Sequence, residues 1–165
     1  MFKLQIHAVG KDHGSPTADL TLKYVERAQD LARGLGIDGP HLNIVEAPRA
    51  LTGVALQGRE ADLLLSGLPP SGWVILLDEG GKDVSSRGWA DLIRKQRDEA
   101  AGSMSFLLGG ADGFAGDISQ KLGGRPHRKV SLGKATWPHL LARVMVAEQI
   151  YRSLTLLAGH PYHRD

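Results

Sequence analysis

Short apolar stretches recur along the chain and alternate with longer stretches of helical character. Five of them have the length and composition of β-strands, and they cover residues 2–9, 41–47, 73–78, 104–108 and 128–132. Strands that alternate with helices in this way are typical of a sheet whose strands run in the same direction. The pattern therefore predicts an α/β domain with a mostly parallel sheet of about five strands.

Helix signals lie between these strands. The first helix is expected to begin at Ser15-Pro16, where a capping side chain precedes a proline at the first helical position. It should end near Gly34 and Gly36. The dense charge of residues 90–101 is typical of a helix that faces solvent.

The last helix, expected over residues 138–158, is apolar on two sides. On a helical wheel one side carries His139, Arg143, Val146, Ile150 and Leu157, and the other carries Leu141, Val144, Met145, Tyr151 and Thr155. A helix of this kind needs two surfaces to cover it. Either it is fully internal to the chain, or a second subunit covers one side, which motivates the expectation of a homodimer.

Length and composition fit one compact domain over residues 1–165. The chain is 42% hydrophobic, enough for a substantial core. Cysteine is absent, which removes disulfide frameworks, thiolate metal sites and cysteine nucleophiles and suits a reducing cytoplasm. The first residues lack the features of a secretory signal, and no apolar run approaches the roughly 20 residues of a membrane-spanning helix. We therefore expect a soluble, cytoplasmic protein that does not engage a membrane.

Charge is distributed unevenly along the chain. The net charge is only +2, yet residues 121–165 contain eight Lys and Arg against two acidic residues. Such a basic segment indicates an anionic partner, with nucleic acid as the leading candidate. An ordinary solvated surface explains the charge equally well.

Three glycine-bearing segments follow predicted strands, at residues 76–82, 107–113 and 131–137. Because parallel strands end at the same edge of a sheet, we expect these segments to lie together where open α/β sheets bind ligands. Glycines there let the backbone approach a ligand and leave peptide groups free to bond an adenine or a ribose. Taken singly, each segment is also compatible with a plain turn.

Other nucleotide and metal motifs do not fit. Residues 109–113 read Gly-Gly-Ala-Asp-Gly, which is not G-x-G-x-x-G and follows the fourth strand instead of the first. No glycine-rich run ends in Gly-Lys-Ser/Thr, so a Walker phosphate loop is not expected. His160 and His163 are the only close pair of histidines, and a structural metal site usually needs four ligands, so no metal is expected.

The terminal residues 159–165 combine an aromatic ring, two imidazoles and a guanidinium. Such a set can stack a base and bind phosphate, which is how proteins hold single-stranded RNA. Chain ends are otherwise usually frayed. The sequence alone therefore leaves both an RNA-binding tail and a frayed one open.

These residues together resemble the ribosomal RNA large subunit methyltransferase H family of the SPOUT class. The resemblance is carried by Leu107–Gly110, Gly113, Ser131-Leu132, Thr136, Pro138-His139, Arg143, Glu148–Arg152 and His160–Arg164. Lys3-Leu4, Val9-Gly10, Leu77-Asp78 and Gly81-Lys82 fit as well. The similarity spans nearly the whole chain, and its carboxyl-terminal combination is specific.

The resemblance implies a SPOUT α/β-knot fold, in which the carboxyl-terminal part of a parallel sheet forms a trefoil knot and the last helix forms a homodimer. It implies S-adenosylmethionine as the methyl donor, held bent by the knot loops. The implied acceptor is N3 of a pseudouridine in a stem-loop of large-subunit ribosomal RNA, on the assembled ribosome. The alternatives are a SPOUT enzyme for another RNA, such as transfer RNA, and a non-catalytic RNA-binding module that kept the fold.

Individual roles follow from the same resemblance. The implied cofactor-binding residues are Leu77, Gly109, Leu132, Gly133, Lys134, Ala135, Thr136 and Trp137, of which Lys134 and Trp137 replace smaller or aliphatic residues of the family. The residues implied to face RNA are His139, Arg152, Tyr162, His163 and Arg164, with the tail reaching the partner's site.

The implied chemistry needs a base, because N3 must lose its proton. His163 is the first candidate, and Arg152 and Arg164 would stabilise charge or hold phosphate. Two plainer roles stay open. Arg152 can form an intrahelical ion pair with Glu148, and His139 can close the start of its helix.

Overall fold

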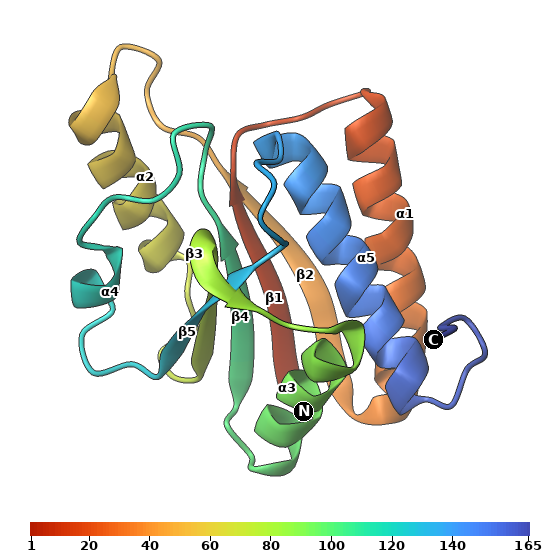
Figure 1. Ribbon diagram of the computed structural model, residues 1–165. Coiled ribbons are helices and arrows are strands. Elements are labelled where there is room, and N and C mark those ends of the chain that lie inside the picture. The colour runs from red at the N-terminus through yellow and green to blue at the C-terminus, as the bar shows by residue number, and fades with distance from the viewer.

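The computed structural model describes residues 1–165 and contains a five-stranded sheet with helices on both faces (Figure 1). The strands are β1 (Phe2–Val9), β2 (Ile37–Val45), β3 (Trp73–Asp83), β4 (Ser103–Leu108) and β5 (His127–Ser131). Their order across the sheet is β2-β1-β4-β3-β5, and every neighbouring pair is parallel. The predicted α/β class and the parallel sheet are confirmed.

The helices form a layer on each face of the sheet (Figure 1). One layer consists of α1 (Pro16–Ala32), the short 3-10 helix η1 (Arg33–Leu35), α3 (Ser86–Asp98) and α5 (His139–Leu157). The other consists of α2 (Gly53–Ser66) and α4 (Ile118–Lys121). Every residue of the central strand β4 is buried, as expected for a parallel strand covered on both faces. None of the helices is long and apolar enough to cross a membrane.

Element boundaries follow local signals where these exist. Ser15 caps α1 through its hydroxyl, and Gly36, with φ 71°, ends η1, both as predicted. β2 begins at Ile37, earlier than predicted, because this buried residue pairs with Phe2. Pro40 obscures the strand in the sequence, and it is tolerated because β2 lies at the edge of the sheet.

The last helix, α5, lies where the sequence predicts it, but the chain itself covers most of both its sides. α5 packs against α1 and α3. Val144, Tyr151 and Thr155, on the second side, are therefore buried within a single chain. Leu141 stays exposed and Met145 half-buried. The apolar pattern of α5 thus supports a dimer only near these two residues.

The carboxyl end of β3 folds around β5. Leu77 pairs with Val130, the register then shifts, and Lys82 pairs with Val130 again. The end of β3 curls beside β5 (Figure 1). Between them, Gly81 packs on the β5 backbone so closely that a Cβ would lie 2.6 Å from the Val130 nitrogen. This arrangement is consistent with a trefoil knot, which stays a prediction from the resemblance.

Candidate functional site

The three glycine-bearing segments meet in one cavity of about 450 Å³ at the carboxyl edge of the sheet. We call it the edge cavity. Its walls are residues 77–79 in the second half of β3, residues 108–114 at and after the end of β4, and residues 131–137 except Lys134 at and after the end of β5, with His139 and Ala142 from α5. Parallel strands deliver their carboxyl ends to one edge, so segments far apart in the sequence form one site. Of the predicted cofactor-binding residues, only Lys134, which is exposed, does not line the cavity.

The turn after β4 is compact because it contains glycine. The N–H of Gly113, which has φ 74°, donates to the carbonyl of Gly110 at 3.0 Å. A Cβ at Gly109 would lie 2.9 Å from the carbonyl carbon of Gly113. Gln57 of α2 holds the turn from behind, since its Nε2 donates to the carbonyl of Asp112 at 2.7 Å. The turn therefore presents its peptide groups to the edge cavity with little side-chain bulk.

The segment after β5 is shaped by its own side chains. The Ser131 hydroxyl donates to the carbonyl of Gly133 at 2.7 Å and accepts from its N–H at 3.1 Å. The indole Nε1 of Trp137 donates to the carbonyl of Leu132 at 3.3 Å. The Trp137 side chain, 41% exposed, thereby lies over this segment and lines the edge cavity with an aromatic surface.

The edge cavity is acidic. Asp78, Glu79 and Asp112 line it, and no Lys or Arg does. Carboxylates in a partly enclosed site attract cations and repel phosphates, so a phosphorylated nucleotide is disfavoured here. A sulfonium compound with an adenine and a ribose is favoured, because glycine peptide groups can bond the base and sugar. The residues present therefore fit S-adenosylmethionine.

Sequence reasoning gave no role to Asp78, Glu79 or Asp112. Asp78 and Glu79 lie in β3 just beyond its last pair with β4, and Asp112 lies in the glycine turn after β4; these positions were the available signal. The Asp78 carboxylate accepts the N–H of Gly80 at 2.8 Å, which holds it against the irregular second half of β3. The pattern located the segments but not which side chains turn inward.

His139 is the one predicted RNA-facing residue that lines the edge cavity. Burial, and then the charge of Arg143, lower the pKa of its imidazole, so His139 is neutral at neutral pH and able to accept a proton. No side-chain cap bond forms at the start of α5, so His139 does not close the helix. Buried Arg143 donates to the carbonyls of Val9 at 2.8 Å and Gly10 at 2.7 Å, tying α5 to the end of β1.

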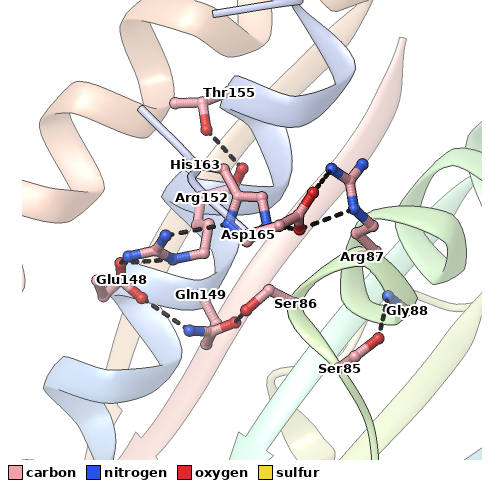
Figure 2. A network of polar contacts seen from close by, with 10 residues as sticks. All are labelled: Ser85, Ser86, Arg87, Gly88, Glu148, Gln149, Arg152, Thr155, His163 and Asp165. Carbon is pink, nitrogen blue, oxygen red and sulfur yellow. Dashed lines mark hydrogen bonds and ion pairs between the residues drawn. The ribbon is translucent and has the colours of Figure 1, made fainter. Parts of the chain in front are cut away.

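The tail is docked on its own chain, at the opposite end of α5 (Figure 2). Glu148 accepts from Arg152 at 2.9 and 2.6 Å, which confirms the predicted ion pair. Arg152 Nη1 also contacts His163 Nδ1 at 3.1 Å. The other nitrogen of His163 contacts Asp165 at 2.9 Å, and Asp165 pairs with Arg87 of α3. The network ties the tail to α5 and α3.

Tyr162 and Arg164 complete the tail. The Tyr162 ring lies 4.8 Å from the guanidinium carbon of Arg152, and its hydroxyl donates to Glu148 at 3.1 Å. Arg164 is exposed. None of the predicted RNA-facing residues of the tail, nor Arg152, lines the edge cavity. At 1.5 Å per helical residue, the backbone of Arg152 lies about 20 Å along α5 from that of His139.

Part of the basic carboxyl-terminal segment is used inside the molecule. Lys121 pairs with Asp62 at 2.8 Å, and Arg125 donates to a backbone carbonyl at 2.5 Å. Arg143 and Arg152 are engaged as described above. The charge asymmetry of the sequence therefore overstates the positive charge available to a partner.

Comparison with known proteins assigns the chain to a family. The family model described as "Predicted SPOUT methyltransferase" matches residues 2–163. A protein of Methylocella silvestris named ribosomal RNA large subunit methyltransferase H is 39% identical over 163 residues, 99% of each chain. Proteins of the same name from Hyphomonas neptunium and Paramagnetospirillum magneticum are each 40% identical over 162 residues, 98% of this chain and 99% of theirs. The chain therefore belongs to the SPOUT methyltransferase family, together with the proteins named ribosomal RNA large subunit methyltransferase H.

Proposed function

We propose that the protein transfers a methyl group from S-adenosylmethionine to N3 of pseudouridine-1915 in 23S ribosomal RNA, on the assembled ribosome in the cytoplasm. One observation carries the donor half of the proposal: three glycine-bearing segments meet in an acidic cavity that suits a sulfonium ligand. The printed name of the relatives supports the acceptor half, since it specifies large-subunit ribosomal RNA.

The residues of the edge cavity would hold the donor. When bound, S-adenosylmethionine supplies an electrophilic methyl carbon on a sulfonium sulfur. Leu77, Gly109 and the 132–136 segment lie where they can enclose it, although Lys134 points to solvent. Trp137 would cover the ligand and keep water out. Methyl transfer is an in-line displacement, so alignment and the exclusion of water are the main contributions expected from the protein.

Two histidines are candidates for the group that accepts the N3 proton. His163 is the first, with Arg152 and Arg164 holding phosphate or stabilising the anion, and Tyr162 stacking on a base. In the docked tail both nitrogens of His163 are engaged, so it must leave these contacts before it can act. His139 is the second candidate, because it already lines the edge cavity as a neutral imidazole.

The separation of the tail from the edge cavity supports a homodimer. In one chain Arg152 and the tail lie at the far end of α5 from the cavity, so a second copy would have to bring them to the acceptor. A second cavity of about 530 Å³, the side groove, offers a surface for that copy. The side groove includes Leu20 and Tyr24 of α1 and Met145 of α5, and it adjoins the edge cavity at residues 131–133. Sedimentation that shows only monomer at micromolar concentration would contradict this assembly.

The decisive test is methyl transfer in vitro. Labelled S-adenosylmethionine is incubated with ribosomes from a strain that lacks the enzyme and, separately, with bulk transfer RNA, and the labelled nucleoside is identified by mass spectrometry. We expect N3-methylpseudouridine from ribosomes and little label in transfer RNA. Label in transfer RNA and not in ribosomes would show that transfer RNA is the acceptor. The absence of S-adenosylmethionine binding in calorimetry would indicate a non-catalytic RNA-binding module. His139→Ala and His163→Ala, assayed in parallel, show which imidazole the reaction needs.

A further inference from the structure

A buried carboxyl group that the proposed reaction does not use lies behind the turn after β4. Glu60 of α2 is 5% exposed, and its Oε2 has no hydrogen-bond partner. The other buried residues of α2 are Ala61 and Leu64, both apolar. A buried polar group destabilises the fold unless it is paired, so an apolar side chain at this position would favour folding.

Glu60 lies directly against the backbone of Gly110. A Cβ at Gly110 would overlap Oε2 of Glu60, so any larger residue at this position would have to displace the carboxyl group. Burial raises the pKa of Glu60, and the backbone N–H of Gly110 lowers it in part. The carboxyl group and the Gly110 peptide therefore lie in direct contact, and the contact favours the charged form of Glu60.

The Gly110 peptide separates Glu60 from the edge cavity. Gly110 lines the cavity and Glu60 does not. The Gly110 carbonyl accepts from Gly113, and Gln57, one turn before Glu60, donates to Asp112. α2 therefore contacts the turn at two points, through Gln57 and through Glu60. The contact of Glu60 is with Gly110, whose carbonyl accepts the hydrogen bond that closes the turn.

We propose that Glu60 is a positioning residue for donor binding, whose carboxyl group holds the Gly110 peptide and thereby keeps the turn after β4 in the shape that lines the edge cavity. The inference rests on the proposed function, because it assigns Glu60 to the binding of S-adenosylmethionine. It explains why α2 carries a destabilising carboxyl group where an apolar residue would pack well, since function and stability often conflict at such sites.

Two variants of the full chain separate the roles of Glu60. Glu60→Leu fills a similar space without an acceptor, and Glu60→Gln keeps an acceptor oxygen for the Gly110 amide. Asp62→Asn is the matched control, because Asp62 is on the same helix but is exposed and pairs with Lys121. The measurements are the thermal unfolding midpoint, hydrogen exchange of the Gly110 and Gly113 amides without ligand, and the Kd of S-adenosylhomocysteine by calorimetry.

We expect Glu60→Leu to unfold at or above the wild-type temperature. In this variant the two amides should exchange about tenfold faster and S-adenosylhomocysteine should bind about tenfold more weakly, the order of loss expected when one polar contact is removed. Glu60→Gln should stay within about threefold of wild type in exchange and binding, and the control should be unchanged. A purely structural residue would instead lower the unfolding temperature and the affinity together.

The proposal is overturned if Glu60→Leu leaves amide exchange or affinity within about twofold of wild type, less than a typical single hydrogen bond contributes. It is also overturned if this variant is less stable than wild type or does not fold, because Glu60 is then a structural residue. If the wild-type protein does not bind S-adenosylhomocysteine, the proposed function fails. Exchange in the ligand-free protein still decides whether Glu60 positions the turn.

Discussion

Replacing Gly81 with alanine tests whether the end of β3 passes tightly over β5. A Cβ at Gly81 would lie 2.6 Å from the nitrogen of Val130 and 2.7 Å from the carbonyl carbons of Lys129 and Val130. Ordinary van der Waals contacts begin at 3.4 Å. All three atoms belong to the backbone of β5, so no side-chain rotation can relieve the overlap, and the two chain segments must move apart.

The size of the effect follows from overpacking. Forcing one extra carbon into a packed region costs about 1–3 kcal/mol of unfolding free energy. In a chain of this length each kcal/mol lowers the midpoint by about 2–4 °C, so Gly81→Ala should unfold about 2–12 °C below wild type. The displaced segment includes Asp78, so affinity for S-adenosylhomocysteine should fall as well.

Thermal unfolding followed by circular dichroism measures the shift, at one fixed protein concentration because a dimer would unfold in a concentration-dependent way. Gly80→Ala is the matched control. Its Cβ would meet only the Asp78 carboxylate oxygen, at 3.1 Å, on a side chain that can move. If Gly81→Ala is as stable as Gly80→Ala, the tight passage of β3 over β5 is refuted.

Three further predictions concern single side chains. Burial lowers the pKa of His7 from 6.5 to about 4, so the unfolded chain takes up a proton first, and stability present above pH 6.5 is lost as the pH falls towards 4. In urea unfolding, the free energy of unfolding of His7→Gln should therefore fall by on the order of 3 kcal/mol less than that of wild type over this pH range. Parallel pH profiles of variant and wild type would contradict this. Trp137→Leu should weaken S-adenosylhomocysteine binding about tenfold and Trp137→Phe much less, as expected for aromatic stacking. If calorimetry gives both variants the wild-type affinity, Trp137 does not contact the ligand. Arg87, and then His163, hold the pKa of Asp165 at about 2, so Arg87→Ala should raise it towards 3.8 in an NMR titration, and an unmoved value would show that the tail is not docked on α3.

The sequence by itself determined the features that depend on near neighbours. The periodicity of apolar residues located the five strands, and Ser15 with Pro16 marked the start of α1. The edge cavity was foreseeable because parallel strands must end at one edge, which brings their glycine turns together whatever the strand order. The resemblance then supplied the family, and with it the expectation that these segments bind S-adenosylmethionine.

Tertiary structure alone decided the features that join distant parts of the chain. Glu60 looks like any surface acid of a helix, and only the packing of α2 places it behind Gly110. Arg143 reads as a basic residue free to bind an anion, yet it is buried against the end of β1. The tail reads as part of the active site, yet in a single chain α5 places it far from the edge cavity. Spacing along the chain reports the local geometry of a strand or helix, whereas these contacts depend on how layers stack, which no short segment encodes.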